Sequence, residues 1–307
     1  MILIITHKED YTADYVINIL NQREIPYHRL NTDDIGIKHN ISFVSNEENV
    51  KISIDDFVNF KSIWFRRTKP PNFPFANDNE KSFFTKDFRA FLNNLWASLK
   101  IENWISHPKD IYNAENKLYQ LKLAKKIGFT TPKTIVSTDK KEIEFFYRES
   151  NGQIIIKPLF GGRYYDEGKP KLVFTNKVKK EHILNNTDFV SFPMVFQEEI
   201  IKKYELRVTI VNGKVFTAKI DSQSSNITKL DWRKDRMKFT KYDLPNEISE
   251  KCKKIVGEMN LKFGAIDLIK TESDYIFLEI NPNGQWVWIE NDTGLKISDE
   301  IINYLIK

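Results

Sequence analysis

Two apolar segments near the carboxyl end, separated by a short polar stretch, constrain the fold of this chain most. Residues 263–269 and 277–284 each contain an apolar run that is typical of a strand, and the polar residues between them favour a turn. We therefore predict an antiparallel hairpin. Two registers remain open, in which Asp267 lies opposite either Leu278 or Glu279. The register decides which polar side chains share a face.

The second register gathers three oxygen-bearing side chains on one face of the hairpin. Side chains alternate along a strand, so Glu279 and Asn281 point the same way, and Asp267 joins them. Two carboxylates and an amide suit Mg²⁺, a hard cation that prefers oxygen ligands. A half-exposed hairpin with polar residues on its solvent-exposed face explains the same pattern, and these residues alone do not separate the two interpretations.

Composition and charge exclude several classes of protein. The 307 residues favour about two domains, and 41% hydrophobic with 29% charged residues is typical of a soluble globular protein. The chain turns polar by Thr6 and has no apolar run of spanning length, which argues against a signal peptide and against a membrane partner. The single cysteine, Cys252, excludes an internal disulfide, so a cytoplasmic location is expected.

The excess of positive charge is mild. The net charge of +5 is spread along the chain, whereas nucleic-acid binding usually concentrates it on one face of a recognisable module. We therefore expect no nucleic-acid partner. An anionic ligand, such as a nucleotide phosphate or an acidic peptide, would explain the excess equally well.

The first third of the chain alternates strand, helix and strand. Residues 2–6 are an apolar run that predicts a buried strand, and residues 26–30 predict a second one. Residues 11–21 between them have helical spacing, with Thr12 as the expected N-cap. This order predicts an open α/β domain. Further strands are expected at residues 52–54 and 62–65, the second running into a proline-rich loop.

The remaining two thirds mix helices and strands. One continuous helix is expected over residues 111–127, ending at Gly128, a natural residue to follow a helix. Asn212-Gly213 is the strongest hairpin signal in the chain. Other helices are expected over residues 83–99, 142–149, 177–184 and 244–260, and other strands over 130–136, 154–159, 195–200, 205–211 and 214–221.

A lysine at the end of a strand precedes a glycine loop. Lys157 followed by Gly161 and Gly162 can place an ammonium group and backbone N–H groups on phosphate oxygens. The alternative is a surface lysine before an ordinary turn, and on this segment alone that alternative is favoured.

An extended acidic segment follows a later strand. The backbone of Gln197-Glu198-Glu199-Ile200 can pair with an adenine edge, and Glu205 at the start of the next strand can take ribose hydroxyls. The alternative is an exposed acidic linker, which is the better interpretation of this segment in isolation.

Three cations lie in or beyond the Asn212-Gly213 hairpin. Arg207 and Lys219 are expected as near neighbours on its two arms, and Arg233 follows. Two cations held together are unfavourable without an anion between them, which points to a triphosphate or an acyl phosphate. The alternative is two solvated residues on opposite faces of the strand pair.

An arginine pair follows the strand at residues 62–65. The guanidinium groups of Arg66 and Arg67 suit a carboxylate, which two parallel N–H donors can hold. The alternative is surface charge beside a proline loop. The five histidines are dispersed without metal-ligand spacing, and no nucleophile or phosphate-loop motif is present in the sequence.

Taken in order, these segments resemble an ATP-grasp ligase. The resemblance rests on Asn116-Lys117-Leu118, Ile156-Lys157-Pro158, Gln197-Glu198-Glu199-Ile200, Glu205-Leu206-Arg207, Asp267, and Glu279-Ile280-Asn281-Pro282. It implies an α/β (α+β) ATP-grasp fold. The implied domains are a Rossmann-like pre-ATP-grasp domain at residues 1–112, a central lid at 113–195 and an ATP-grasp domain at 196–307.

Finer segments narrow the resemblance to the ATP-grasp maturases of graspetides, which are microviridin-type ω-ester and ω-amide peptides. These segments are residues 62–67, 216–223, Asp231-Trp232-Arg233 and 281–286. The implied reaction converts an Asp or Glu side chain of a precursor peptide into an acyl phosphate, which a Thr or Ser hydroxyl or a Lys amine then attacks. The implied partner is a precursor peptide with a leader segment, and the implied assembly is a homodimer.

The resemblance also implies the roles of the site residues. Lys117 and Lys157 would contact ATP, with Gly161, Gly162 and the loop to residue 168 closing over it. The segment from Gln197 to Ile200 would hold adenine, and Glu205 the ribose. The remaining roles are Mg²⁺ binding by Asp267, Glu279 and Asn281, neutralisation of the phosphoryl group and carboxylate by Arg207, Lys219 and Arg233, and substrate binding by Arg66 and Arg67.

Two other functions remain open. A ligase of the glutamate-ligase type, which adds a free amino acid to a peptide or small acid, shares the core motifs. A non-catalytic ATP-binding module is the third interpretation, and the carboxylates of Asp267 and Glu279 argue against it. The sequence does not identify the precursor, the ring connectivity, the choice of ester or amide, or the leader-binding surface.

Overall fold

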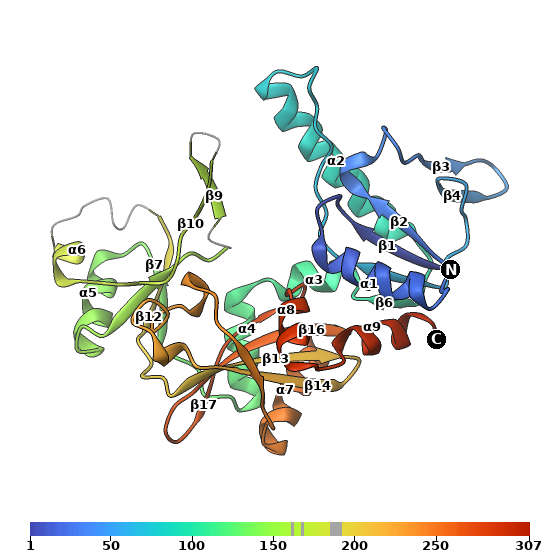
Figure 1. The fold of residues 1–307 in the computed structure, drawn as a ribbon. Helices are drawn as coiled ribbons and strands as arrows, with labels where there is room; N and C mark the ends of the chain where they lie inside the picture. Colours follow the sequence, from blue (N-terminus) through green and yellow to red (C-terminus); the bar gives the residue numbers. More distant parts are fainter. Residues whose placement is uncertain (161–162, 167–168, 185–191) are drawn as a thin grey trace.

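The computed structural model describes residues 1–160, 163–166, 169–184 and 192–307. Three units follow one another along the chain, and the last of them lies between the other two (Figure 1). No helix among these residues is long and apolar enough to cross a membrane.

The first unit is built on a parallel sheet in the order β2-β1-β5-β6. Helix α1 (Tyr11–Gln22) connects the first two strands, and α2 (Asp78–Ser98) projects from the body of this unit (Figure 1). A separate two-stranded ribbon is formed by β3 (Ile41–Ser45) and β4 (Val50–Ile54). The strands of the parallel sheet are β1 (Ile2–Thr6), β2 (Tyr27–Asn31), β5 (Ser62–Phe65) and β6 (Asn103–Ile105), and a single 3₁₀ turn, η1, covers Thr32–Asp34.

Two helix starts differ from the sequence prediction. Asp10, not Thr12, is the N-cap of α1, because the Asp10 carboxylate accepts the backbone N–H of Thr12 at 3.1 Å. Helix α2 begins at Asp78, before the predicted start at residue 83, because Asn77 and Glu80 form a reciprocal capping box.

The single helix predicted over residues 111–127 is two helices, α3 (Pro108–Ala114) and α4 (Lys117–Ile127). The chain breaks at Asn116, whose side chain accepts the Tyr119 N–H at 3.0 Å and caps α4. The predicted end is confirmed, since Gly128 follows α4 with a left-handed φ of 94°. The break places Lys117 in the first turn of α4.

The central unit is an antiparallel sheet in the order β11-β8-β12-β7, with its own small core around Ile143, Ile154 and Phe196. A hairpin of β9 (Arg163–Asp166) and β10 (Lys169–Leu172) stands out from it (Figure 1). Its other elements are β7 (Thr134–Ser137), α5 (Lys140–Glu149), β8 (Ile154–Lys157), β11 (Asn176–Lys177), α6 (Lys180–Leu184) and β12 (Met194–Glu198).

The third unit is an antiparallel sheet in the order β15-β14-β13-β16-β17. The predicted Asn212-Gly213 hairpin is confirmed, and both turn residues have positive φ, 47° and 81°. Its elements are β13 (Tyr204–Val211), β14 (Lys214–Ile220), η3 (Ser222–Ser224), η4 (Trp232–Lys234), β15 (Phe239–Lys241), α7 (Asn246–Glu258), β16 (Phe263–Lys270), β17 (Tyr275–Asn281), α8 (Val287–Thr293) and α9 (Ile297–Leu305).

The hairpin of β16 and β17 uses both predicted registers. Near its turn Leu268 pairs with Phe277, and after a bulge Asp267 pairs with Glu279, so Leu278 is the extra residue. The register that the metal hypothesis needs is therefore the one that holds at Asp267.

The first and third units share their hydrophobic cores. One core joins Leu3 and Phe65 of the parallel sheet to Leu206 of β13 and Ile255 of α7. A second core packs α1 against α9 and the fully buried Trp286. Because the central unit has a separate core, it is the part whose movement disturbs the least buried apolar surface.

Candidate active site

A cleft of about 1360 Å³ brings together predicted site residues from all three units. It is larger than most small-ligand pockets, which leaves room for a nucleotide and part of a second substrate. Its walls include Arg66, Arg67, Lys117, Lys157, Gln197, Glu198, Glu199, Ile200, Glu205, Arg207, Arg233, Asp267, Glu279 and Asn281. Gly161 and Gly162 lie outside the described residues.

The oxygen-bearing residues of β16 and β17 meet on one face of the sheet. The Asn281 amide donates to an oxygen of Asp267 at 3.1 Å and to one of Glu279 at 3.3 Å. The three side chains therefore form one connected group. Two carboxylates thus lie beside this amide, and a half-turn of the amide would present its oxygen together with theirs to a hard divalent cation.

Cations surround these carboxylates. One nitrogen of Arg207, which lies opposite Asp267 on β13, donates to both carboxylate oxygens at 2.6 Å. Lys117, at the start of α4, forms an ion pair with Glu279. The split of the predicted helix at Asn116 is what brings Lys117 to this position.

The two carboxylates have opposite protonation tendencies. Burial raises the pKa of Asp267 even though Arg207 opposes the shift. Burial opposes ionisation of Glu279 as well, but Lys117 and Lys157 outweigh it and hold the pKa of that carboxyl well below its usual range. Glu279 is thus the member of the pair that favours the charged form.

Lys157 ends β8 and extends from the central unit toward the same carboxylates. Burial lowers the pKa of its ammonium group, and the charge of Glu279 opposes that shift. A buried ammonium next to Lys117 and Arg233 gains most from a multiply charged anion, because such an anion offsets all three charges.

The predicted adenine-binding segment connects the central and third units. Gln197 is buried and donates to the Thr134 hydroxyl at 2.9 Å, while Glu198 accepts the Lys133 N–H at 2.8 Å. Glu199 pairs with Lys177 at 2.6 Å. These side chains already have partners within the protein, and the residues from Gln197 to Ile200 all line the cleft.

Glu205 is almost fully buried at the start of β13. Burial raises the pKa of its carboxyl, although Lys202 donates a hydrogen bond to it at 2.9 Å and opposes the shift. The sequence reasoning missed Lys202. Its spacing of three residues from Glu205 was the available signal.

Arg233 is oriented by a residue that the sequence prediction left without a role. Asp231 is buried and accepts two guanidinium bonds from Arg233, at 2.8 and 2.6 Å. The same carboxylate accepts, at 3.3 Å, the backbone N–H of Thr175, a residue between β10 and β11 of the central unit. Asp231 therefore connects the arginine to the central unit. The spacing Asp231-x-Arg233 was the signal in the sequence.

Lys219 is not beside Arg207. It pairs with Leu206 across the strands, and pleating turns Leu206 and Arg207 to opposite faces. The Lys219 ammonium lies 4.4 Å from the centre of the Tyr204 ring instead. The expectation that these two cations share one anion is wrong for this fold. The two residues lie on opposite faces, as the alternative had it, but Arg207 is buried against Asp267 and not solvated.

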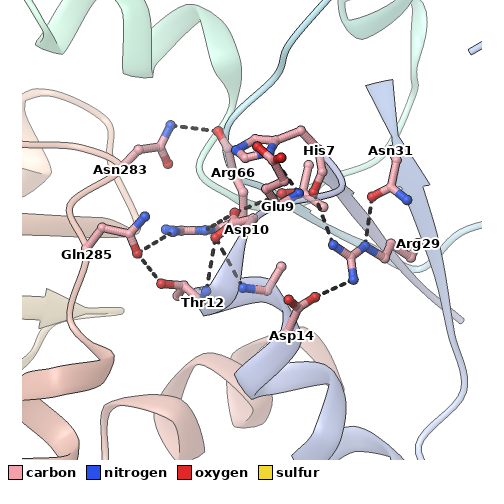
Figure 2. Close-up of polar contacts among 12 residues, drawn as sticks. His7, Glu9, Asp10, Thr12, Asp14, Arg29, Asn31, Arg66, Asn283 and Gln285 are labelled. Carbon is pink, nitrogen blue, oxygen red and sulfur yellow. Dashed lines mark hydrogen bonds and ion pairs between the residues drawn. The ribbon is translucent and has the colours of Figure 1, made fainter. Parts of the chain in front are cut away.

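Arg66 is buried and already has partners (Figure 2). Its Nε donates to Asp10 at 3.3 Å and its Nη2 donates to Gln285 at 3.3 Å, while its backbone oxygen accepts the amide of Asn283 at 3.0 Å. This contradicts the expectation that Arg66 and Arg67 present a matched pair of guanidinium groups to a carboxylate. Arg67 is exposed and remains on the wall of the cleft.

Two histidines that the sequence separates lie together with Asp55 in the first unit. His28 and His39 contact the same Asp55 oxygen at 2.8 and 2.9 Å. The Asn31 N–H donates to Nε2 of His39 at 3.2 Å, so the proton of that ring is on Nδ1 and points at Asp55. Without a lone pair on Nδ1, His39 serves as a donor that fixes the β3–β4 ribbon rather than as a metal ligand.

Two family models cover the chain. One described as the RimK-like ATP-grasp domain matches residues 114–305, and one described as the MvdD pre-ATP grasp domain matches residues 1–112. A comparison with curated proteins gives no match.

Solved structures resemble the whole chain. A RiPP-associated ATP-grasp ligase of Chryseobacterium gregarium, in complex with ADP and a leader and core peptide, is 28% identical with a TM-score of 0.90, over 99% of this chain and 96% of that one. The macrocyclase MdnC of Microcystis aeruginosa MRC, bound with precursor peptide MdnA, is 29% identical with a TM-score of 0.88, over 100% and 99%. The ATP-grasp ligase PsnB, complexed with minimal precursor, Mg and ADP, is 18% identical with a TM-score of 0.79, over 99% and 96%, and shows the fold alone.

Proposed function

Because this chain belongs to the RimK-like ATP-grasp family, we propose that it is an ATP-dependent macrocyclase of a ribosomally made precursor peptide. The predicted ATP-grasp fold and the resemblance to graspetide maturases are confirmed, and the chain is an ATP-grasp ligase. The observation that carries the proposal is the cleft in which Asp267, Glu279 and Asn281 meet Arg207, Lys117 and Lys157. It lies in a chain that matches two peptide-bound ligases over their full length.

ATP and Mg²⁺ are the cofactors of the proposed reaction: the ADP in the similar ligase of Chryseobacterium gregarium supports the nucleotide, and the carboxylates of β16 and β17 suit the cation. Adenine would pair with the backbone of the segment from Gln197 to Ile200, and ribose hydroxyls with Glu205. Lys117 and Lys157 would hold the phosphates. Asp267, Glu279 and Asn281 would hold Mg²⁺, which when bound neutralises phosphate charge.

The reaction must first make a carboxylate electrophilic. A side-chain carboxylate oxygen of the peptide attacks the γ-phosphorus of ATP, the bond to ADP breaks, and an acyl phosphate forms. Arg207 and Arg233 offset the negative charge that meets at this point, and catalysis is mainly positioning and charge neutralisation. Lys219 has no part in this step, because it lies on the other face of the sheet.

The second step closes the ring. A hydroxyl or amine of the same peptide attacks the acyl carbon, inorganic phosphate leaves, and the nucleophile loses its proton. Water would destroy the acyl phosphate, so a closing lid is needed. We assign that role to a central domain at residues 113–195, between a pre-ATP-grasp domain at 1–112 and an ATP-grasp domain at 196–307. The separate core of the central unit supports the assignment.

The partner of the proposed reaction is a precursor peptide with a leader segment, as supported by the leader and core peptide in one similar structure and the precursor peptide in the other. A homodimer is part of the proposal, and mass measurement in solution would test it. A monomer at assay concentration would remove that part and leave the reaction unaffected.

The test is the intact mass of a precursor peptide encoded beside this gene after incubation with the protein, ATP and Mg²⁺. Loss of one or more waters that requires ATP and is abolished by Glu279→Gln supports the macrocyclase. Gain of an amino-acid residue supports instead a ligase of the glutamate-ligase type. An unchanged mass with tight nucleotide binding contradicts both and favours a non-catalytic module.

A further inference from the structure

The N-terminal unit contacts the loop that follows the predicted metal ligands through the side chain of Gln285 (Figure 2). Gln285 lies four positions after Asn281, at the end of the loop that follows β17. It lines the cleft and is half-buried. The sequence prediction gave it no role.

The orientation of this carboxamide is determined by its partners. Arg66 can only donate hydrogen bonds, so its contact at 3.3 Å must be with the oxygen of Gln285. Thr12 donates to the same oxygen through its hydroxyl. The amide nitrogen therefore lies on the opposite side, as Figure 2 shows.

The two partners are themselves firmly held. Arg66 is 2% exposed, pairs with the buried Asp10, and lies 5.3 Å from the centre of the Trp64 ring. Thr12 is in the first turn of α1, which Asp10 caps. Burial of a guanidinium group costs desolvation free energy, even when an ion pair offsets part of it. Its use here to hold one amide indicates that the orientation of that amide matters.

The amide nitrogen of Gln285 carries two N–H groups that are available as hydrogen-bond donors. Among the described residues no hydrogen bond uses it, and it is also absent from their buried unpaired polar atoms, so it is accessible to solvent. Gln285 lines the cleft, and because its oxygen is bound to Arg66 and Thr12, the nitrogen is the polar atom that it has left to offer a ligand there. Two N–H donors thus face the space where a substrate would lie.

The position within the cleft identifies which substrate this is. The predicted adenine segment contacts residues of the central unit, such as Lys133 and Thr134, whereas Gln285 contacts Arg66 and Thr12 of the first unit. The carboxylates of Asp267 and Glu279 lie on β16 and β17 of the third unit, which shares its hydrophobic cores with the first unit. The end at Gln285 is therefore available to the acceptor and not to the nucleotide base.

We propose that Gln285 binds a carbonyl or carboxylate oxygen of the acceptor peptide through its amide N–H groups, and that Arg66 and Thr12 are positioning residues that orient it. The inference rests on the proposed function, because it requires a peptide acceptor. It assigns to Arg66 an indirect part in substrate binding in place of the direct one expected from the sequence.

The decisive variant is Gln285→Glu. A glutamate keeps an oxygen for Arg66 and Thr12, so a purely structural link between the units would persist. It replaces the N–H donors by an acceptor that repels a substrate oxygen. We expect kcat/KM for the peptide to fall at least about tenfold, which corresponds to about 1.4 kcal/mol, with KM for ATP and the melting temperature close to those of the wild type.

Two further variants complete the experiment. Thr12→Val removes one orienting hydroxyl with little change in volume. We expect it to lower kcat/KM for the peptide by less than Gln285→Glu does. Gln22→Glu makes the same chemical change on an exposed residue of α1 outside the cleft and is the matched control.

The measurement is ATP-dependent phosphate release with the peptide that the wild type dehydrates in the mass assay. Wild-type kcat/KM in Gln285→Glu overturns the inference, as does a fall that is matched by equal losses in ATP binding and thermal stability. If the wild type dehydrates no peptide, the proposed function fails, and this inference fails with it for a peptide acceptor. If the wild type cyclises the peptide and Gln285→Glu does so equally well, the inference is rejected and the proposed function stands.

Discussion

At the scale of single residues, the site is organised by side chains that hold other side chains. Arg207 holds Asp267, Asp231 holds Arg233, and Lys202 holds Glu205. Such pairs fix the geometry before a ligand arrives, which is what electrostatic stabilisation of a developing charge requires. The last two pairs are close in the sequence, whereas Arg207 and Asp267 are 60 positions apart and only the fold brings them together.

Asp231→Asn is expected to slow the reaction without weakening nucleotide binding. The amide keeps the size of the side chain but loses the charge and one acceptor, so Arg233 loses its bidentate contact. A charge-assisted hydrogen bond contributes about 1.5–3 kcal/mol, so kcat should fall roughly tenfold to a hundredfold. Steady-state kinetics with varied ATP provide the measurement.

The control for this prediction is Asp56→Asn, the same change on an exposed residue of the first unit. It should leave kcat unchanged. An Asp231→Asn variant that raises KM for ATP and leaves kcat intact would contradict the positioning role of Asp231.

At the scale of elements, a bulge and a glycine bring the predicted metal ligands together. The bulge between Asp267 and Leu268 shifts the register so that Asp267 faces Glu279. Beyond the strand, the loop turns back against β16 so closely that a Cβ on Gly284 would lie 2.6 Å from the Cβ of Ala265. No L-residue with a side chain fits there without a shift of the loop.

Gly284→Ala is therefore expected to move the loop that contains Asn281 and Gln285. Overpacking of this kind costs about 1–3 kcal/mol of unfolding free energy. The Mg²⁺ concentration for half-maximal activity should also rise, because the Cβ and the backbone oxygen of Asn281 would each lie 3.3 Å from the added methyl. Denaturant unfolding and Mg²⁺ titration check the two effects separately.

Gly257→Ala is the matched control within α7. A Cβ there would meet nothing within 4 Å, so the substitution should stabilise the protein by about 0.5–1 kcal/mol. Unchanged Mg²⁺ dependence and stability in Gly284→Ala would show that the loop relaxes freely, against the prediction.

At the scale of the whole molecule, the first and third units form one body with shared cores, and the central unit has a core of its own. Cys252 of α7 belongs to a shared core and is fully buried. Burial raises the pKa of its thiol to about 12, because a thiolate is not stabilised in an apolar environment.

Cys252 should therefore resist alkylation in the folded protein at about pH 8 and react once the shared core opens. In increasing denaturant, labelling should follow the change in tryptophan fluorescence, because the buried Trp96 and Trp286 belong to the shared cores as well. Intact mass after a pulse of iodoacetamide measures the fraction of Cys252 that is labelled. A Cys252→Ala variant should gain no label, and rapid labelling without denaturant would contradict the burial of this thiol.

The sequence by itself determined the family of this protein and named most of the polar residues that line its cleft. The periodicity of residues 263–281, the Asn212-Gly213 turn and the order of the polar motifs are local features, and local backbone preferences decide them. Because these features are local, the strands, the hairpins and the ATP-grasp fold could be predicted from the amino-acid order.

Only the tertiary structure decided which of these residues act together. Strand pleating turned Lys219 away from Arg207, and burial against Asp10 and Gln285 removed Arg66 from direct contact with a substrate. It also gave roles to Asp231 and Gln285, because each contacts a residue of another unit. These residues are Thr175 for Asp231 and Thr12 for Gln285. The physical reason is that contacts between distant segments depend on register, packing and burial, which no local sequence pattern specifies.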